Sequence, residues 1–218
     1  MREKVIEKTL EEKIIAIVRG MEEDKILPLA EAFYEGGIRM MEVTFNLRQP
    51  GSNAATARAI QAVADRFAGD MMIGAGTVVS TELVDIAYKA GALYIVSPGT
   101  DVDVIRYTKE LGLASMPGAL TPTECLTAHN AGADFVKLFP AGEMGPGYIK
   151  SIKAPLSHIN FLATGGIDEK NIPDFLKVGV SAFGVGGNLV NKAWIEAGEY
   201  NKITDLAKLM VEAAKTVI

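Results

Sequence analysis

One lysine lies inside an apolar segment, where its amine could act as a nucleophile. The segment is "DFVKLFPA", residues 134–141, in which Lys137 shares a period-two face with Phe135 and Phe139. An amine attacks a carbonyl only when it is unprotonated, and at the ordinary pKa of about 10.4 roughly one lysine in 2,500 is neutral at pH 7. An apolar strand lowers that pKa by desolvation. We therefore predict that Lys137 forms a Schiff base with a ketone.

Glu42, in the apolar segment "RMMEVTF" (residues 39–45), could move the protons that such a reaction needs. A carboxylate in direct contact with Lys137 would raise the pKa of the amine again, so a position one water away suits this role better. Taken alone, each residue has a structural alternative. Glu42 could be hydrogen-bonded to a loop, and Lys137 could form an ion pair or extend to solvent. Together they favour proton transfer beside a covalent lysine intermediate.

The two segments belong to a series of eight short apolar segments, spaced roughly 20–30 residues apart. They are residues 13–19, 39–45, 71–77, 93–99, 114–120, 134–141, 160–166 and 182–188. Each is too short for a helix and lacks the alternation of a half-exposed strand. Both properties are typical of parallel strands that are buried on two faces.

Helical patterns lie between these segments and complete the expected fold. Capping residues predict helix starts at Thr81, Asp101, Thr121 and Asp168. With an extra N-terminal helix over residues 1–12 and a closing helix over 201–217, the order predicts an α/β fold, a single (β/α)8 TIM barrel in one domain over residues 1–218. An open doubly wound sheet is the alternative, but "AIVRGMEED" after the first strand lacks the Gly-rich dinucleotide loop of such a sheet.

In such a barrel the C-terminal ends of the strands build the active site. Besides Lys137 and Glu42, the candidate substrate-binding side chains at these ends are Arg19, Thr44, Asn46, Thr77, Pro98, Phe139 and Thr164. Period-two spacing places Glu42, Thr44 and Asn46 on one face. We expect these side chains to lie around one cavity.

Two glycine-rich turns, "ATGGID" and "GVGGNLV", follow the last two apolar segments. Gly165 and Gly166 lie in the first turn, and Gly186, Gly187 and Asn188 in the second. Glycine lets backbone N–H groups approach an oxyanion closely, and barrels often bind a phosphate at this place. The alternative is a pair of tight turns that need positive φ. Two such pairs on adjacent strands favour the phosphate.

Composition excludes several other classes of function. A net charge of −5 (22 basic against 27 acidic residues) is not that of a nucleic-acid partner, and it disfavours an anionic membrane surface. The charged start has no apolar signal region, and the single Cys125 allows no internal disulfide, so we expect a cytoplasmic protein. His129 and His158 have no metal-ligand spacing, which predicts no metal site.

The motifs "EVT", "IGAGTV", "SPG", "MPGALTPTE", "FVKLFPA", "TGGI" and "GVGGNLV" occur in this order along nearly the whole chain. In them the sequence resembles the family of 2-keto-3-deoxy-6-phosphogluconate (KDPG) and 4-hydroxy-2-oxoglutarate (KHG) aldolases. The resemblance implies a class I aldolase that acts on a small 2-keto acid and releases pyruvate. It also implies a homotrimer and no metal or organic cofactor.

The resemblance also assigns roles to individual residues. Lys137 matches the Schiff-base lysine and Glu42 the general acid/base. The residues that match those holding the pyruvate part are Thr77, Pro98 and Phe139, and Arg19 matches an arginine that meets the substrate carboxylate. The phosphate-binding turns are matched by Gly165, Gly166 and Gly187.

Two positions depart from the family pattern. Asn46 stands where many gluconate-type members have arginine, and galactonate-type relatives also carry asparagine there. Asn188 stands where serine is usual. The favoured function is cleavage of a 2-keto-3-deoxy-6-phospho sugar acid, KHG or both; a KDP-galactonate aldolase is the alternative. A barrel enzyme of another class, such as a sugar-phosphate epimerase, and a non-catalytic sugar-acid binder also stay open.

Overall fold

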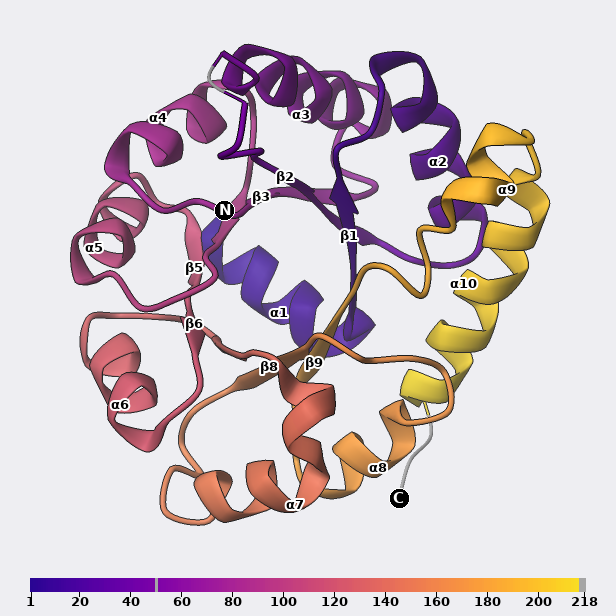
Figure 1. Cartoon of the computed structure of the whole chain (residues 1–218). Helices are drawn as coiled ribbons and strands as arrows, with labels where there is room; N and C mark the ends of the chain where they lie inside the picture. The colour runs from indigo at the N-terminus through magenta and orange to yellow at the C-terminus, as the bar shows by residue number, and fades with distance from the viewer. Residues whose placement is uncertain (50, 216–218) are drawn as a thin grey trace.

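The apolar segments form parallel strands around a common axis (Figure 1). The computed structural model describes residues 1–49 and 51–215. The strands are β1 (Ile14–Arg19), β2 (Met40–Thr44), β3 (Met72–Gly76), β4 (Tyr94–Val96), β5 (Ala114–Met116), β6 (Gly118–Ala119), β7 (Val136–Leu138), β8 (Phe161–Thr164) and β9 (Ala182–Val185). They pair in the order β5-β4-β3-β2-β1-β9-β8-β7-β6. This is the predicted parallel α/β barrel.

The barrel has nine strands rather than the predicted eight because Pro117 divides the fifth segment. Proline has no backbone N–H to donate to a neighbouring strand. Before it, β5 pairs with β4, and after it, β6 pairs with β7. The N–H of Lys137 donates to the Pro117 carbonyl (2.8 Å) and the N–H of Asp134 to the Ser115 carbonyl (2.9 Å). These bonds join the two ends of the sheet.

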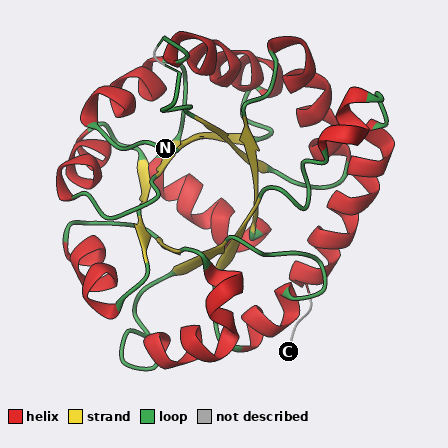
Figure 2. Ribbon diagram, viewed as in Figure 1, coloured by secondary structure: helices red, strands yellow, loops and turns green. Residues whose placement is uncertain are grey.

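Helices surround the strands as an outer ring (Figure 2). The ring consists of α2 (Glu23–Glu35), α3 (Asn53–Phe67), α4 (Thr81–Lys89), α5 (Val102–Glu110), α6 (Pro122–Asn130), α7 (Ala141–Lys153), α8 (Ile172–Lys177), α9 (Lys192–Glu196) and α10 (Tyr200–Lys215). Helix α1 (Arg2–Glu12) lies inside it. The described part of the chain contains no helix that is both long and apolar enough to cross a membrane.

Side-chain caps mark the starts of α4, α5, α6 and α9. Asp101 accepts bonds from two backbone N–H groups of α5, and Thr121 forms a capping box with Glu124 at the start of α6. The start predicted at Asp168 is wrong. Its carboxylate accepts from the N–H groups of Lys170 and Asn171 in a turn, and α8 begins only at Ile172. Residues 216–217 of the predicted closing helix lie outside the described residues.

Helix α1 lies across the barrel axis, at the N-terminal ends of the strands (Figure 1). Its Val5 is fully buried and packs on the apolar side chains inside the barrel. These are Ile15, Met40, Met72, Tyr94, Val96, Ala114, Met116, Phe135, Leu162 and Ala182. The extra N-terminal helix is therefore confirmed, and it closes one end of the barrel. Only the C-terminal end is left for a site.

Asp134 fastens α1 to the barrel. Its side chain is 3% exposed and accepts from Nη2 of Arg2 (2.6 Å), Nζ of Lys109 (3.1 Å) and the backbone N–H of Ser115 (2.9 Å). Charge-assisted hydrogen bonds of this kind are stronger than neutral ones. One carboxylate thus joins α1, α5, β5 and the start of β7.

We expect Asp134→Ala to lower the free energy of unfolding by about 2 kcal/mol, because the Ser115 N–H loses its acceptor and α1 loses its anchor. Urea unfolding followed by circular dichroism measures the change. The matched control is Asp174→Ala, which removes an exposed carboxylate paired only with Lys177 and should cost little. Equal stabilities of the two variants would contradict the anchoring role.

Candidate active site

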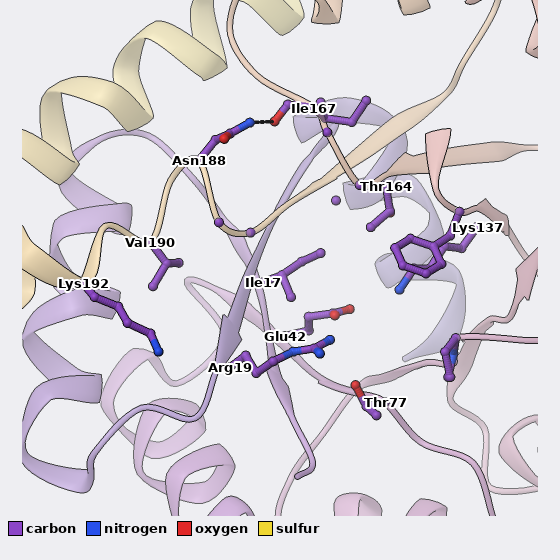
Figure 3. A pocket seen from close by; sticks show the side chains of 17 residues that line it. Ile17, Arg19, Glu42, Thr77, Lys137, Thr164, Ile167, Asn188, Val190 and Lys192 are labelled. Atoms are coloured by element: carbon purple, nitrogen blue, oxygen red, sulfur yellow. Dashed lines mark hydrogen bonds between the residues drawn. The ribbon is translucent and has the colours of Figure 1, made fainter. Parts of the chain in front are cut away.

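A cavity of about 520 Å³ opens at the C-terminal ends of the strands. This size suits a small organic substrate. The predicted residues that line it are Arg19, Glu42, Thr77, Pro98, Lys137, Phe139, Thr164, Gly165, Gly166, Gly187 and Asn188. Figure 3 shows Arg19, Glu42 and Lys137 extending into the same space from three strands. The structure therefore brings together every predicted site residue except Thr44 and Asn46.

Lys137 lies on the inward face of β7 and is 8% exposed. Burial lowers the pKa of its ammonium group below the ordinary 10.5; the Glu42 charge opposes this shift and the Arg19 charge adds to it. The ammonium nitrogen lies 5.3 Å from the centre of the Phe139 ring. The surroundings therefore favour the neutral, nucleophilic amine, as the sequence predicted.

Glu42 lies on β2 and is 2% exposed. Burial raises the pKa of its carboxyl group, while the charges of Lys137 and Arg19 lower it. The charges of Glu42 and Lys137 act on each other through space, without a direct hydrogen bond between the two side chains. The carboxyl group lies over Gly76 of β3, where any larger side chain would overlap it. Glycine at this position leaves the room that the carboxyl group occupies.

Thr77 follows β3 in an unusual backbone conformation. Its φ of 58° lies in the left-handed region, which a β-branched residue rarely adopts. Strained residues of this kind cluster at functional sites, where the surrounding structure holds them in place. Thr77, predicted to hold the pyruvate part, lines the cavity on the side of Arg19, predicted to meet the substrate carboxylate (Figure 3).

The structural reason for glycine differs between the two glycine-rich turns. Gly165 and Gly166 have φ of 88° and 70°, so their backbone conformation alone accounts for glycine there. Gly187 has no positive φ, and a side chain added to it would meet nothing within 4 Å. Close approach of a ligand to the backbone therefore remains the better interpretation of Gly187. The side-chain amide of Asn188 donates to the Ile167 carbonyl (2.9 Å), which links the two turns.

Asn46 lies outside the cavity. It faces a neighbouring hollow of about 190 Å³ between the loops that follow β1 and β2. Its amide donates to Oε1 of Gln49 (3.2 Å), and its side-chain oxygen accepts from the N–H of Arg48 (3.2 Å). The period-two rule placed Asn46 beside Glu42, but β2 ends at Thr44 and the alternation ends with it. Thr44 lines this hollow as well, but its side chain lies over Gly76 beside the Glu42 carboxyl group, so these two residues do share a face as predicted.

Four further side chains line the cavity that were not predicted: Ile17, Ile167, Val190 and Lys192. Ile17 precedes Arg19 by two residues on β1, so the strand period could have identified it. Lys192 begins α9 after an irregular loop, and no sequence pattern indicates where its side chain lies. It adds a positive charge to the cavity lining on the side of Val190 (Figure 3).

The histidines lie away from this cavity. The rings of His129 and His158 contact each other edge to face at 4.8 Å. Among the residues that the structure describes, no three His, Cys, Asp or Glu side chains come together in a way that could hold a metal ion. The chemistry of the cavity is therefore that of an amine, a carboxyl group and an arginine.

Known proteins resemble the chain over most of its length. The family model "KDPG and KHG aldolase" matches residues 5–206. A 2-dehydro-3-deoxy-6-phosphogalactonate aldolase of Escherichia coli (strain K12) is 36% identical over 177 residues, which cover 81% of this chain and 83% of the relative. A 2-dehydro-3-deoxy-phosphogluconate aldolase of Haemophilus influenzae is 32% identical over 216 residues, 98% of both chains.

A crystal structure is similar as well. It is that of a KDPG aldolase from Legionella pneumophila, with pyruvate captured at low pH as a covalent carbinolamine intermediate. The TM-score is 0.82 at 29% identity, and the match covers 91% of this chain and 94% of that one. A carbinolamine forms when an amine adds to a carbonyl group. Fold, family model and relatives agree: the chain belongs to the KDPG and KHG aldolase family and is an aldolase, a carbon–carbon lyase.

Proposed function

We propose that the protein is a class I aldolase that cleaves a 2-keto-3-deoxy-6-phospho sugar acid, 4-hydroxy-2-oxoglutarate or both. The products are pyruvate and either glyceraldehyde 3-phosphate or glyoxylate. The observation that carries this proposal is a buried amine with a lowered pKa, Lys137, in one cavity with the buried carboxyl group of Glu42. Such a pair supports covalent catalysis with proton transfer.

The first half of the reaction builds an electron sink. The neutral Lys137 amine attacks the C2 ketone of the substrate and forms a carbinolamine. Glu42, through a water, gives a proton to the C2 hydroxyl, which leaves as water, and an iminium remains on Lys137. Because Glu42 and Lys137 are not directly bonded, a water can lie between them and carry protons.

The second half breaks the carbon–carbon bond. Glu42, now a carboxylate, takes the proton of the C4 hydroxyl, and C4 becomes the carbonyl carbon of the leaving aldehyde. The C3–C4 electron pair moves into the iminium and leaves a pyruvate enamine on Lys137. Glu42 returns the proton to C3, and water hydrolyses the iminium to release pyruvate and the free amine.

The remaining cavity residues hold the substrate in our proposal. Arg19 and Thr77 bind its carboxylate, while Pro98 and Phe139 pack on the pyruvate carbons. This orientation aligns the C3–C4 bond with the iminium system, which is the geometry that cleavage requires. Positive charge from Arg19 and a strained, fixed Thr77 support the assignment.

The far end of a phosphorylated substrate would lie at the glycine-rich turns. Thr164, Gly165 and Gly166 border it on one side, and Gly187 and Asn188 on the other. The galactonate-type substrate is the second candidate. The E. coli galactonate-type relative is 36% identical, against 32% for the gluconate-type relative of H. influenzae, and Asn46 matches the asparagine of the galactonate type.

This chemistry uses an amine of the protein itself and needs neither a metal nor an organic cofactor. The covalent carbinolamine in the L. pneumophila aldolase supports this part of the proposal. A cytoplasmic homotrimer stays a prediction from the sequence and its family resemblance. Sedimentation of the purified protein would test the trimer.

The proposal is tested by mixing the protein with pyruvate and sodium borohydride and then mapping the mass adduct. The expected result is one reduced pyruvate adduct on Lys137. A barrel enzyme such as an epimerase would turn over a sugar phosphate without this adduct, and a sugar-acid binder would show neither. An unmodified Lys137 would therefore overturn the proposal.

Lys192→Ala offers a test of how the far end of the substrate is bound. Because Lys192 adds a positive charge to the cavity that the glycine-rich turns also line, we expect its loss to raise KM for the 6-phospho substrate about tenfold and to change KM for unphosphorylated 4-hydroxy-2-oxoglutarate by less than about twofold. Steady-state kinetics on both substrates measure the difference. The control is Lys177→Ala on the exposed face of α8. Equal changes for both substrates would contradict a contact with phosphate.

A further inference from the structure

Tyr94 carries a buried hydroxyl group that the proposed mechanism does not use. The residue is fully buried inside the barrel, and its Oη has no hydrogen-bond partner among the described residues. A buried hydroxyl group without a hydrogen-bond partner lowers the stability of the folded protein by roughly 1–3 kcal/mol. Phenylalanine would fill the same space without that cost. The Tyr94 hydroxyl therefore needs a hydrogen-bond partner that the side chains, as arranged in this structure, do not supply.

The positions of two glycines place this hydroxyl beneath Glu42. In the sheet, Gly74 of β3 pairs with Glu42 of β2 on one side and with Tyr94 of β4 on the other. The Tyr94 ring lies against Gly74, where a larger side chain would overlap ring atoms up to Cζ. The ring thus extends from β4 across β3 towards β2. The Glu42 carboxyl group lies over Gly76, two residues further along β3 and on the same inward face.

Charge interactions agree with this placement. Burial raises the pKa of Tyr94, and the nearby Glu42 charge raises it further, so Tyr94 stays a protonated donor. The other charged groups that act on Glu42 are Lys137 from β7 and Arg19 from β1. Both line the cavity, whereas Tyr94 approaches from the closed interior of the barrel. Tyr94 can therefore reach Glu42 without displacing substrate.

Two other buried hydroxyls also lack partners in the described structure, those of Thr44 and Thr164. Thr164 lines the cavity and Thr44 the neighbouring hollow, although both hydroxyl oxygens are buried. Tyr94 lines neither space. Its partner is therefore a protein group, reached directly or through an enclosed water, and Glu42 is the acceptor whose charge acts on it.

We propose that Tyr94 is a positioning residue for the Glu42 carboxylate: its hydroxyl donates a hydrogen bond to Glu42, directly or through one enclosed water, whenever Glu42 is ionised during the reaction. The bond holds the carboxylate towards Lys137 and favours the ionised form that takes the proton from the substrate. When Glu42 is protonated its carboxyl group is a weaker acceptor, and the bond weakens.

This proposal rests on the aldolase function above, and the test separates the two. The parent protein and Tyr94→Phe are incubated with pyruvate in deuterium oxide, and exchange of the pyruvate methyl protons is followed by NMR as a function of pH. Exchange requires the Schiff base and a base at C3, but no aldehyde. Tyr88→Phe, which removes the same atom from an exposed residue of α4, is the matched control.

In Tyr94→Phe the acid limb of the exchange profile should move about 1 pH unit higher, because the ionised form of Glu42 loses a donor. Borohydride trapping should remain, and the unfolding temperature should stay the same or rise. If the pH profile of Tyr94→Phe matched that of the parent protein, the proposal for Tyr94 would be overturned, whatever the unfolding temperature of the variant. The aldolase function would be unaffected by that result. Absence of both trapping and exchange in the parent protein would overturn the aldolase function and this inference together.

Discussion

Lys137→Arg is expected to lower kcat/KM for aldol cleavage by at least about 10⁴-fold, with the fold retained. The guanidinium of arginine stays protonated in proteins, so it cannot attack a carbonyl. Arginine keeps the charge and most of the length of the side chain, so the change removes the amine chemistry above all. Pyruvate release measured with a coupled assay reports the activity, and circular dichroism reports the fold.

A second lysine of lowered pKa supplies the control. Lys153 of α7 is half-buried, and burial lowers its pKa as well, but it lies outside the cavity. Lys153→Arg should therefore keep cleavage within about twofold of the parent. If Lys137→Arg retained cleavage, Lys137 would not be the nucleophile.

The pH dependence of trapping follows from the same residue. Only the neutral amine attacks pyruvate, and the pKa of Lys137 lies below the ordinary 10.5. The initial rate of Schiff-base formation should therefore fall only as the pH drops through this lowered pKa. The half-maximal rate should lie below pH 10.5.

Glu42→Gln is expected to lower kcat by about 10²–10⁴-fold. Trapping of Lys137 with pyruvate should be slower, because Glu42 also assists iminium formation, but the same adduct should still form. Glutamine fits the same site over Gly76 but cannot accept the proton of the C4 hydroxyl. Because the Glu42 charge raises the pKa of Lys137, its removal should also leave the amine neutral at lower pH. Single-turnover cleavage and borohydride trapping measure the two effects separately.

The comparison variant is Glu23→Gln, at an exposed carboxylate of α2 whose partner is Arg58. It should leave both cleavage and trapping unchanged. Cleavage at the parent rate in Glu42→Gln would assign the proton transfer to another group, since an amide cannot carry it.

The strands and two residues of the site, Lys137 and Glu42, could be predicted because both depend on the local sequence. An apolar segment with one charge indicates a buried strand and a perturbed side chain, which holds for Lys137 and Glu42 in the structure. Pro117 was visible in the sequence, but its effect on pairing depends on which neighbour each half of the segment faces.

The errors have physical causes of the same kind. Asn46 was assigned by extending the strand period beyond the last paired residue of β2. Asp168 is a good cap by residue type, yet its carboxylate closes a turn instead of a helix. Lys192 and Tyr94 depend on how loops and neighbouring strands pack, which no local pattern reports. The sequence thus predicts the chemistry of a single segment, but not which residues from distant segments become its neighbours in the fold.

Helix α1 has a practical consequence for use of the protein as an immobilised catalyst. Met1 is 74% exposed at the start of α1, which covers the barrel end opposite the cavity. Lys13 beside the same end donates to the carbonyl of Ala214 in α10. A bead coupled through an exposed side chain of α1 would hold the protein by this end and leave the cavity mouth facing the flowing reactants. Coupling through random surface lysines would instead include Lys192 at the mouth itself.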